Sequence, residues 1–235
     1  MKKEFFRGIV DGIPICLGYL SVSFAFGIFA VESGLEIWQA VLISMACVTS
    51  AGQLAAVPIM VSCGGVLELA ISQLVINMRY ALMSISLSQK LDTSVTTPHR
   101  LAISFVNTDE VFAVASGQKG SIGKGYMYGL ILTPWLGWAV GTLIGSVAGN
   151  VLPDMVTASL GVAIYGMFVA IVVPEMKKSR ATARCALLAA GLICLFYYLP
   201  GVQEIPSGFT IIACAVAASA IMALVAPIGK EGEDG

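Results

Sequence analysis

Hydrophobic residues in this chain gather in long runs, and short polar segments separate the runs. Each run is about 18 to 26 residues long, and a helix needs about 20 residues to cross roughly 30 Å of hydrocarbon. The fold class predicted is therefore an all-α polytopic transmembrane bundle, with seven spans if the run that begins beside Arg184 does not insert. The eight predicted spans cover residues 9–31, 37–61, 64–88, 99–118, 125–149, 156–175, 182–200 and 208–226.

Basic residues between the runs predict the orientation, because lysine and arginine concentrate on the cytoplasmic side of a membrane. With eight spans and a cytoplasmic N-terminus, ten basic residues lie inside, and only Lys90 and Arg100 lie outside. This arrangement predicts that both termini are cytoplasmic. With three spans in each unit, the fourth helix enters from the side opposite to the first, so spans one to three and spans four to six could form an inverted pair; this expectation rests on topology alone.

The composition agrees with an integral membrane protein. The chain is 57% hydrophobic and 11% charged, with a mean hydropathy of +0.89, whereas soluble domains carry about 25% charged residues. We expect one multi-pass domain over residues 1–235 in the inner (plasma) membrane, with residues 227–235 as a short polar tail. The net charge of −1, with basic residues scattered over loops, gives no indication of nucleic acid or an acidic ligand as a partner. Membrane lipid is the partner expected of such a chain, and nucleic acid is not.

Several kinds of chemistry are not indicated by the sequence. The six cysteines form no C-x-x-C pair and there is a single histidine, so we expect no disulfide framework, metal site or cofactor. The zinc-protease motif H-E-x-x-H and the serine-hydrolase motif G-x-S-x-G are both missing. We therefore expect that the chain is not an enzyme.

Three charged residues lie deep within the apolar runs. Arg79 lies in the third run, and the adjacent acids Asp109 and Glu110 lie in the fourth. A charge at the bilayer centre costs about 2.5 to 3.5 kcal/mol even on the mildest scale, so such residues pair with one another or line a polar path. Helical rise puts Arg79 and Asp109 at similar depths, so consecutive antiparallel helices can join them.

Two interpretations of this charged cluster stay open. In the first, the cluster is a coupling or gating site in mid-membrane, for which a substrate or a proton competes. In the second, Arg79 and an acid form a fixed structural ion pair. Two acids facing one arginine leave one carboxylate over, and that carboxylate can take up a proton, which favours the functional interpretation.

Other polar and helix-breaking positions extend the predicted pathway. Asn77 and Tyr80 belong to a polar stripe on the third run, whose residues recur every three or four positions and so share one helix face. The first run contains Pro14 and Gly18, and the second contains Gly52 and Gln53 at mid-length. A helix can unwind at such places and present free backbone groups to a ligand, although a kinked or closely packed helix is the alternative.

The fifth run carries glycines at every fourth position. This spacing leaves a bare groove along one helix face, into which another helix backbone can approach closely. We interpret the groove as a surface for helix packing, within the chain or against a second protein chain. The glycines are Gly137, Gly141, Gly145 and Gly149.

Six sequence blocks resemble the AzlC family in order and spacing. They are GIPICLGYLSVSFAFGIFA, SAGQLAAV, NMRYALMSISLSQKL, NTDEVFAVA, WLGWAVGTLIG and IYGMFVAIVVPEMKKSR. The resemblance implies a permease for amino acid transport, linked to branched-chain amino acid export. It also implies a separate small hydrophobic partner of the AzlD type. Where the family commonly has histidine after the arginine, this chain has Tyr80, which argues against a proton relay through that position.

Two hypotheses from different classes follow. In the first, the chain is a carrier that exports branched-chain or other small apolar amino acids as the large subunit of a two-component system. The substrate's ammonium would meet Asp109 or Glu110, and its carboxylate would meet Arg79 or freed backbone N–H groups. In the second, the chain is a noncatalytic membrane scaffold or assembly subunit whose polar residues only hold partner helices together.

Overall fold

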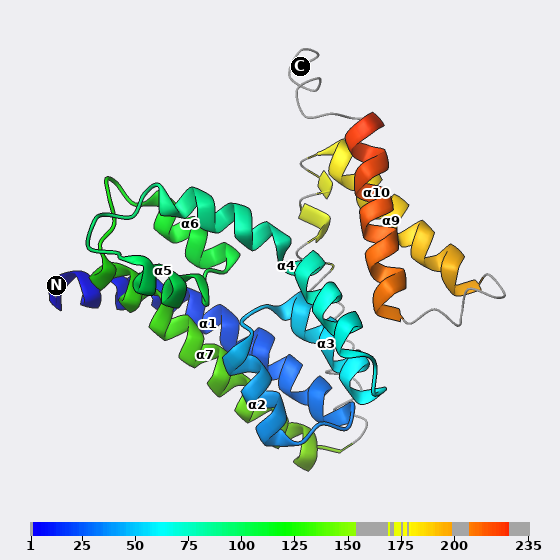
Figure 1. Cartoon of the computed structure of the whole chain (residues 1–235). Helices are drawn as coiled ribbons and strands as arrows, with labels where there is room; N and C mark the ends of the chain where they lie inside the picture. The colour runs from blue at the N-terminus through cyan, green and yellow to red at the C-terminus, as the bar shows by residue number, and fades with distance from the viewer. Residues whose placement is uncertain are drawn as a thin grey trace.

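The computed structural model describes residues 2–153, 169, 172–174, 176–177, 179–198 and 207–225. In these residues the regular elements are α-helices, and the predicted all-α bundle class is confirmed (Figure 1). Four of the helices are long and apolar enough to cross a membrane: Lys2–Glu32, Val66–Ser88, Lys124–Gly149 and Arg180–Tyr198. Most of the predicted sixth span, 156–175, and the whole predicted tail, 227–235, lie outside the described residues.

The first and fifth predicted spans form a close parallel pair, α1 (Lys2–Glu32) and α7 (Lys124–Val151) (Figure 1). Backbones touch because glycines from both helices face the contact. A Cβ on Gly8 would lie 2.2 Å from the Tyr126 carbonyl oxygen, and a Cβ on Gly145 would lie 2.0 Å from that of Phe24. The predicted glycine groove is therefore occupied by α1 of the same chain.

The second predicted span is a helical hairpin and not a continuous helix. It comprises α2 (Ile37–Ala46) and α3 (Ser50–Val61), and Cys47 and Thr49 between them are extended. Val57, on α3, packs with Ala40 on α2 in a cluster near the end of α1, so α3 returns toward the face from which α2 entered. We call residues 37–61 the first hairpin.

The fourth predicted span is also a hairpin, and it enters from the opposite face. It comprises α5 (Thr97–Ser104) and α6 (Asp109–Gly117), and it follows α4 (Val66–Ser88). The segments that flank it are joined: the Ile122 amide donates to the Lys90 carbonyl, the Asp92 amide donates to the Ile122 carbonyl, and both distances are 2.9 Å. We call residues 97–117 the second hairpin.

The loop before the second hairpin is ordered by its own hydrogen bonds. The hydroxyl and amide of Ser94 donate to Asp92 and hold the pKa of that carboxyl below its ordinary value. The Ser94 hydroxyl also accepts from the Lys124 amide at the start of α7. These bonds fasten the loop to the face at which α1 begins, since Arg7 hydrogen-bonds Gln118 just after the second hairpin. We call this the N-terminal face.

The predicted count of eight crossings is therefore wrong for two of the runs, because each hairpin enters and leaves at one face. Hydropathy cannot distinguish one helix of 25 residues from two half-helices of about ten, since both present the same apolar composition. The predicted inverted pair joined three full spans with three full spans, but each of these units contains a hairpin in place of one span. One hairpin lies between α1 and α4 and the other lies between α4 and α7, and the two enter from opposite faces.

The hairpin topology places the basic residues of the loops on one face. Lys90 and Arg100, predicted to lie outside, are at the N-terminal face, as are all other basic residues of 2–153 except Arg79. Glu68, in the first turn of α4, lies at the opposite face. A cytoplasmic N-terminal face thus agrees fully with the positive-inside rule over these residues.

The C-terminal helices lie on the α3–α4 side (Figure 1). The seventh predicted span is α9 (Arg180–Tyr198), which is continuous through Arg184, and the eighth is α10 (Ser207–Val225). α10 contacts α4 and α3.

Cysteine labelling can test the hairpin topology. We expect Thr93→Cys, in the loop before the second hairpin, to react with a membrane-impermeant maleimide only from the side that carries the N-terminus. Glu32→Cys, at the end of α1, should react only from the other side. The measurement uses sealed vesicles of both orientations and a chain whose native cysteines are replaced. Labelling of Thr93→Cys from the Glu32→Cys side would restore the eight-span topology.

Candidate functional site

A cavity of about 880 Å³ lies at the centre of residues 2–153, where the two hairpin tips meet α1, α4 and α7. Its wall contains charged side chains, hydroxyl groups and aliphatic side chains. The lining residues are Pro14, Ile15, Gly18, Tyr19, Val22, Val48, Thr49, Ser50, Ala51, Ile76, Arg79, Tyr80, Thr108, Asp109, Glu110 and Trp138. Six of the predicted pathway residues are among them: Pro14, Gly18, Arg79, Tyr80, Asp109 and Glu110.

Two half-helix N-termini open onto this cavity. Thr49 caps α3 by accepting from the Gly52 amide at 3.1 Å, and Thr108 caps α6 by accepting from the Val111 amide at 3.4 Å. Threonine is a preferred N-cap residue, which explains why each helix restarts there. The first turn of α6 carries two acids, whereas that of α3 carries none. The α3 terminus therefore remains a positive dipole end available to an anion.

The structure brings Arg79 and Asp109 together, with 2.8 Å between Nη2 and Oδ2. The two side chains are 56% and 45% exposed, so the pair faces the cavity instead of being sealed within helix packing. The Arg79 guanidinium also lies over the Tyr80 ring, 5.0 Å from its centroid. A half-exposed pair contributes only about 1 kcal/mol or less, so a charged ligand can compete for either member.

Glu110 has a different partner from Asp109. The Tyr19 hydroxyl lies 2.6 Å from Glu110 Oε2 and 2.6 Å from Thr108 Oγ1, and the Tyr19 ring packs edge-on against Trp138. The spare acid predicted from the sequence is thus Glu110, held by a neutral hydroxyl. The sequence analysis did not identify Tyr19, Thr108 and Trp138 as site residues. Tyr19 could have been found, because it lies next to Gly18 and five residues after Pro14, both of which were predicted to belong to the pathway.

The other predicted pathway residues, Gln53, Gly52 and Asn77, lie behind the cavity wall. Buried Gln53 donates to Ser44 and accepts from the Trp138 indole, both at 2.9 Å. The Gly52 carbonyl accepts from Gln73, which in turn accepts from Asn77 at 3.2 Å. These bonds fasten the tip of the first hairpin to α7 and α4, so the three residues support the site without lining it.

Two expectations about unwound helices have different outcomes. α1 is continuous through Pro14 and Gly18, so the predicted unwinding there is wrong. Proline removes only one helical donor, and α1 is held against α7 on both sides of it by Gly8, Gly12 and Gly27. The interruption in the second run exists but precedes Gly52, at Cys47–Thr49, because Thr49 caps the new helix.

Gln53→Leu is expected to weaken the fold and leave substrate affinity almost unchanged. The variant leaves the Trp138 indole N–H without its acceptor in a buried place, which costs about 1 to 3 kcal/mol. Thermal unfolding in detergent should show a lower midpoint, while the half-saturating substrate concentration stays within about twofold of wild type. A large change in half-saturation at normal stability would instead place Gln53 in the pathway.

Comparisons with known proteins find similar chains among membrane proteins. The chain is 25% identical over 198 residues to the inner membrane protein YgaZ of Escherichia coli (strain K12), covering 81% of each chain. It is 29% identical over 201 residues to an uncharacterized membrane protein of Archaeoglobus fulgidus, covering 84% of this chain and 87% of the relative. No solved structure matches the chain.

The family match spans most of the region that builds the cavity. The family model described as AzlC protein matches residues 14–152, which begin at Pro14 on the cavity wall and end just after α7. This range contains both hairpins and is more than half of the chain. The chain is a membrane protein that belongs to the AzlC family.

Proposed function

We propose that this chain is a transporter that exports branched-chain or other small apolar amino acids across the plasma (inner) membrane. The observation that carries the proposal is the central cavity, because it presents a guanidinium and two carboxyl groups within the apolar runs, between two hairpins that enter from opposite faces. Carriers commonly bind substrate where interrupted helices meet at this depth.

The cavity offers a partner for each part of an amino acid. The carboxylate would accept from the backbone N–H groups of Ser50 and Ala51 at the α3 terminus and from Arg79. The ammonium would meet Glu110 or Asp109. The aliphatic side chain would occupy the apolar wall formed by Ile15, Val22 and Ile76. Among the described residues, we assign the carboxylate to the freed N–H groups of the α3 terminus, since α1 is unbroken and the first turn of α6 carries two acids.

Binding of both substrate charges would compete with the ion pair between Arg79 and Asp109. The ammonium replaces Arg79 as the partner of Asp109, and the carboxylate takes the guanidinium. An exchange of charged partners inside the cavity leaves no charge uncompensated, so the loaded site can reorganise at low cost. Glu110 is the group through which we propose proton coupling, and efflux that is indifferent to an imposed pH gradient would count against that role.

We also propose a small membrane subunit of the AzlD type as the partner. The family resemblance suggests it, and helix surface is available for it. α9 has no buried residue among those that the structure describes, so its surface is open to lipid or to a second chain.

Counterflow in proteoliposomes tests the function. The chain, reconstituted with its partner, should accumulate labelled leucine or valine against an internal load of the same amino acid, and a charged amino acid such as lysine should not be exchanged. Stable assembly with the partner without any amino acid flux would support the alternative, a membrane scaffold.

A further inference from the structure

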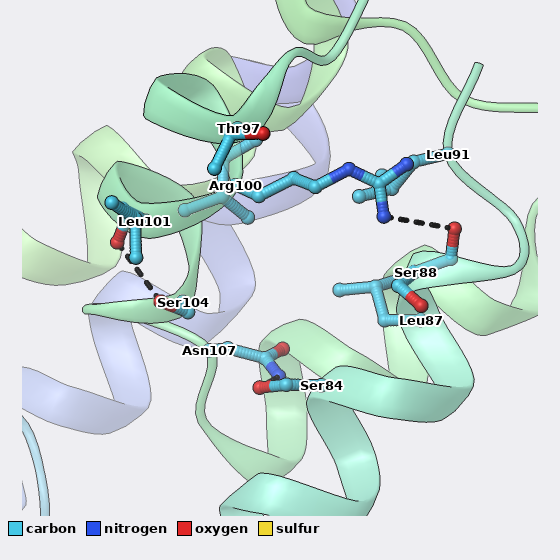
Figure 2. A pocket seen from close by; sticks show the side chains of 10 residues that line it. Ser84, Leu87, Ser88, Leu91, Thr97, Arg100, Leu101, Ser104 and Asn107 are labelled. Carbon is cyan, nitrogen blue, oxygen red and sulfur yellow. Dashed lines mark hydrogen bonds between the residues drawn. The ribbon is translucent and has the colours of Figure 1, made fainter. Parts of the chain in front are cut away.

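A second, smaller cavity lies between α4 and the second hairpin (Figure 2). Its volume is about 170 Å³, of the order of one leucine-sized solute. It lies nearer the N-terminal face than the central cavity does, because its α4 wall is Ser84 to Ser88, beyond Arg79 along that helix. Leu87, Leu101 and Ile103 form its apolar walls.

Asn107 separates the two cavities. It lines the smaller one, while Thr108, the next residue, lines the central one, so the linker of the second hairpin is the partition. Asn107 is 4% exposed, and its amide nitrogen donates to Ser84 at 3.1 Å across the seam between the hairpin and α4 (Figure 2). Its carbonyl oxygen is buried with no hydrogen-bond partner in the part of the chain that the structure describes.

Arg100 supplies a positive charge to the same cavity (Figure 2). Its guanidinium donates to the carbonyls of Val95 and Ser88, at 3.2 and 3.4 Å, and these neutral contacts orient it. No carboxylate pairs with it among the described residues, whose ion pairs involve Arg7 and Arg79. The cavity therefore combines an uncompensated cation, an unused buried acceptor and apolar walls.

We infer that this cavity is an inner subsite at which a small apolar amino acid docks from the N-terminal face before it reaches the central site. This inference rests on the proposed function. Arg100 binds the carboxylate of the amino acid, and the Asn107 carbonyl accepts a hydrogen bond from its ammonium. The apolar walls of the cavity contact its side chain. Separation of Asn107 from Ser84 then opens the seam to the central cavity, where Arg79 and Asp109 form the next contact.

Side-specific kinetics test the subsite. The full chain is reconstituted with its partner, and leucine counterflow is measured with leucine varied on each face in turn. Arg100→Gln should raise the half-saturating leucine concentration at the N-terminal face about tenfold, the usual effect of losing one charge-assisted hydrogen bond. Half-saturation at the opposite face should stay unchanged. The matched control is Lys119→Gln, which removes the same charge from the same face away from the cavity.

Vesicle composition separates an amino acid from a lipid headgroup as the occupant. The measurement is made in phosphatidylcholine alone and in phosphatidylcholine with phosphatidylglycerol. The same tenfold effect in both supports the inference, whereas an effect that needs phosphatidylglycerol assigns the cavity to anionic lipid and overturns it. If wild-type counterflow is normal and Arg100→Gln matches Lys119→Gln, the subsite is wrong and the proposed function stands. Absence of wild-type counterflow would instead defeat the proposed function.

A crosslink tests the seam directly. In a chain without native cysteines, the reduced Ser84→Cys, Asn107→Cys variant should need more leucine for half-saturation, because it lacks the Asn107 acceptor. Oxidation should abolish its remaining counterflow and reduction should restore that level, while each single variant is insensitive to both treatments. Confirmed crosslinking with unchanged flux would show that substrate does not pass between α4 and the second hairpin.

Discussion

Asp109→Asn is expected to lower leucine counterflow at least about tenfold, because it removes the proposed contact to the substrate's ammonium and leaves Arg79 without its partner. An uncompensated guanidinium at this depth also costs about 2.5 kcal/mol or more, so expression and thermal stability must be measured beside transport. Counterflow is compared at equal amounts of inserted protein.

A matched control and a double variant separate the two roles of the pair. Glu4→Gln removes one negative charge from the exposed Arg7–Glu4 pair at the start of α1 and should transport normally. Arg79→Gln combined with Asp109→Asn restores a neutral contact. If the pair serves transport, the double variant inserts well and stays inactive; recovery of counterflow would show that the pair is only structural.

Gly145→Ala is expected to have the largest effect on stability. Its Cβ would lie 2.0 Å from the Phe24 carbonyl oxygen and 2.7 Å from the Phe24 carbonyl carbon, both backbone atoms of α1. The two helices must move apart along their contact, and overpacking of this kind costs about 1 to 3 kcal/mol or more. In thermal unfolding, the midpoint should drop by roughly 5 °C or more.

The control for this substitution is Gly191→Ala in α9. A Cβ at Gly191 meets no described atom within 4 Å, and alanine favours a helix over glycine, so its midpoint should not fall. Equal stability of Gly145→Ala and Gly191→Ala would contradict the close parallel contact of α1 and α7. Because that contact carries Tyr19 and Trp138 to the cavity wall, loss of stability should be accompanied by loss of transport.

The apolar runs were sufficient to predict the class of the fold, since a bilayer requires helices of a certain length and composition. Their number of crossings was not predictable. The short linkers around Val48 and between α5 and α6 leave the hydropathy unchanged, yet they reverse the chain and turn two predicted spans into hairpins. Reversal depends on what the returning helix packs against, such as Val57 against Ala40, and this information is non-local.

The charged residues were predictable as a group because a charge inside an apolar run is conspicuous on any hydropathy scale. Which acid pairs with Arg79 was not predictable, since Asp109 and Glu110 are adjacent and differ only in the direction in which α6 presents them. The roles of Tyr19 and Asn107 were harder still to predict from the sequence. Tyrosine and asparagine have many places in a membrane helix, and only the arrangement of neighbouring helices aims them at a carboxylate or across a seam.

The sequence by itself determined that this chain is a helical membrane protein with an arginine and two acids within its apolar runs. The tertiary structure alone decided that two runs are hairpins whose tips meet, that Glu110 is bonded to Tyr19, and that Asn107 separates two cavities. The physical reason is that burial in lipid is a property of each segment's composition. Contacts between polar groups, in contrast, depend on the relative placement of helices that lie far apart in the chain.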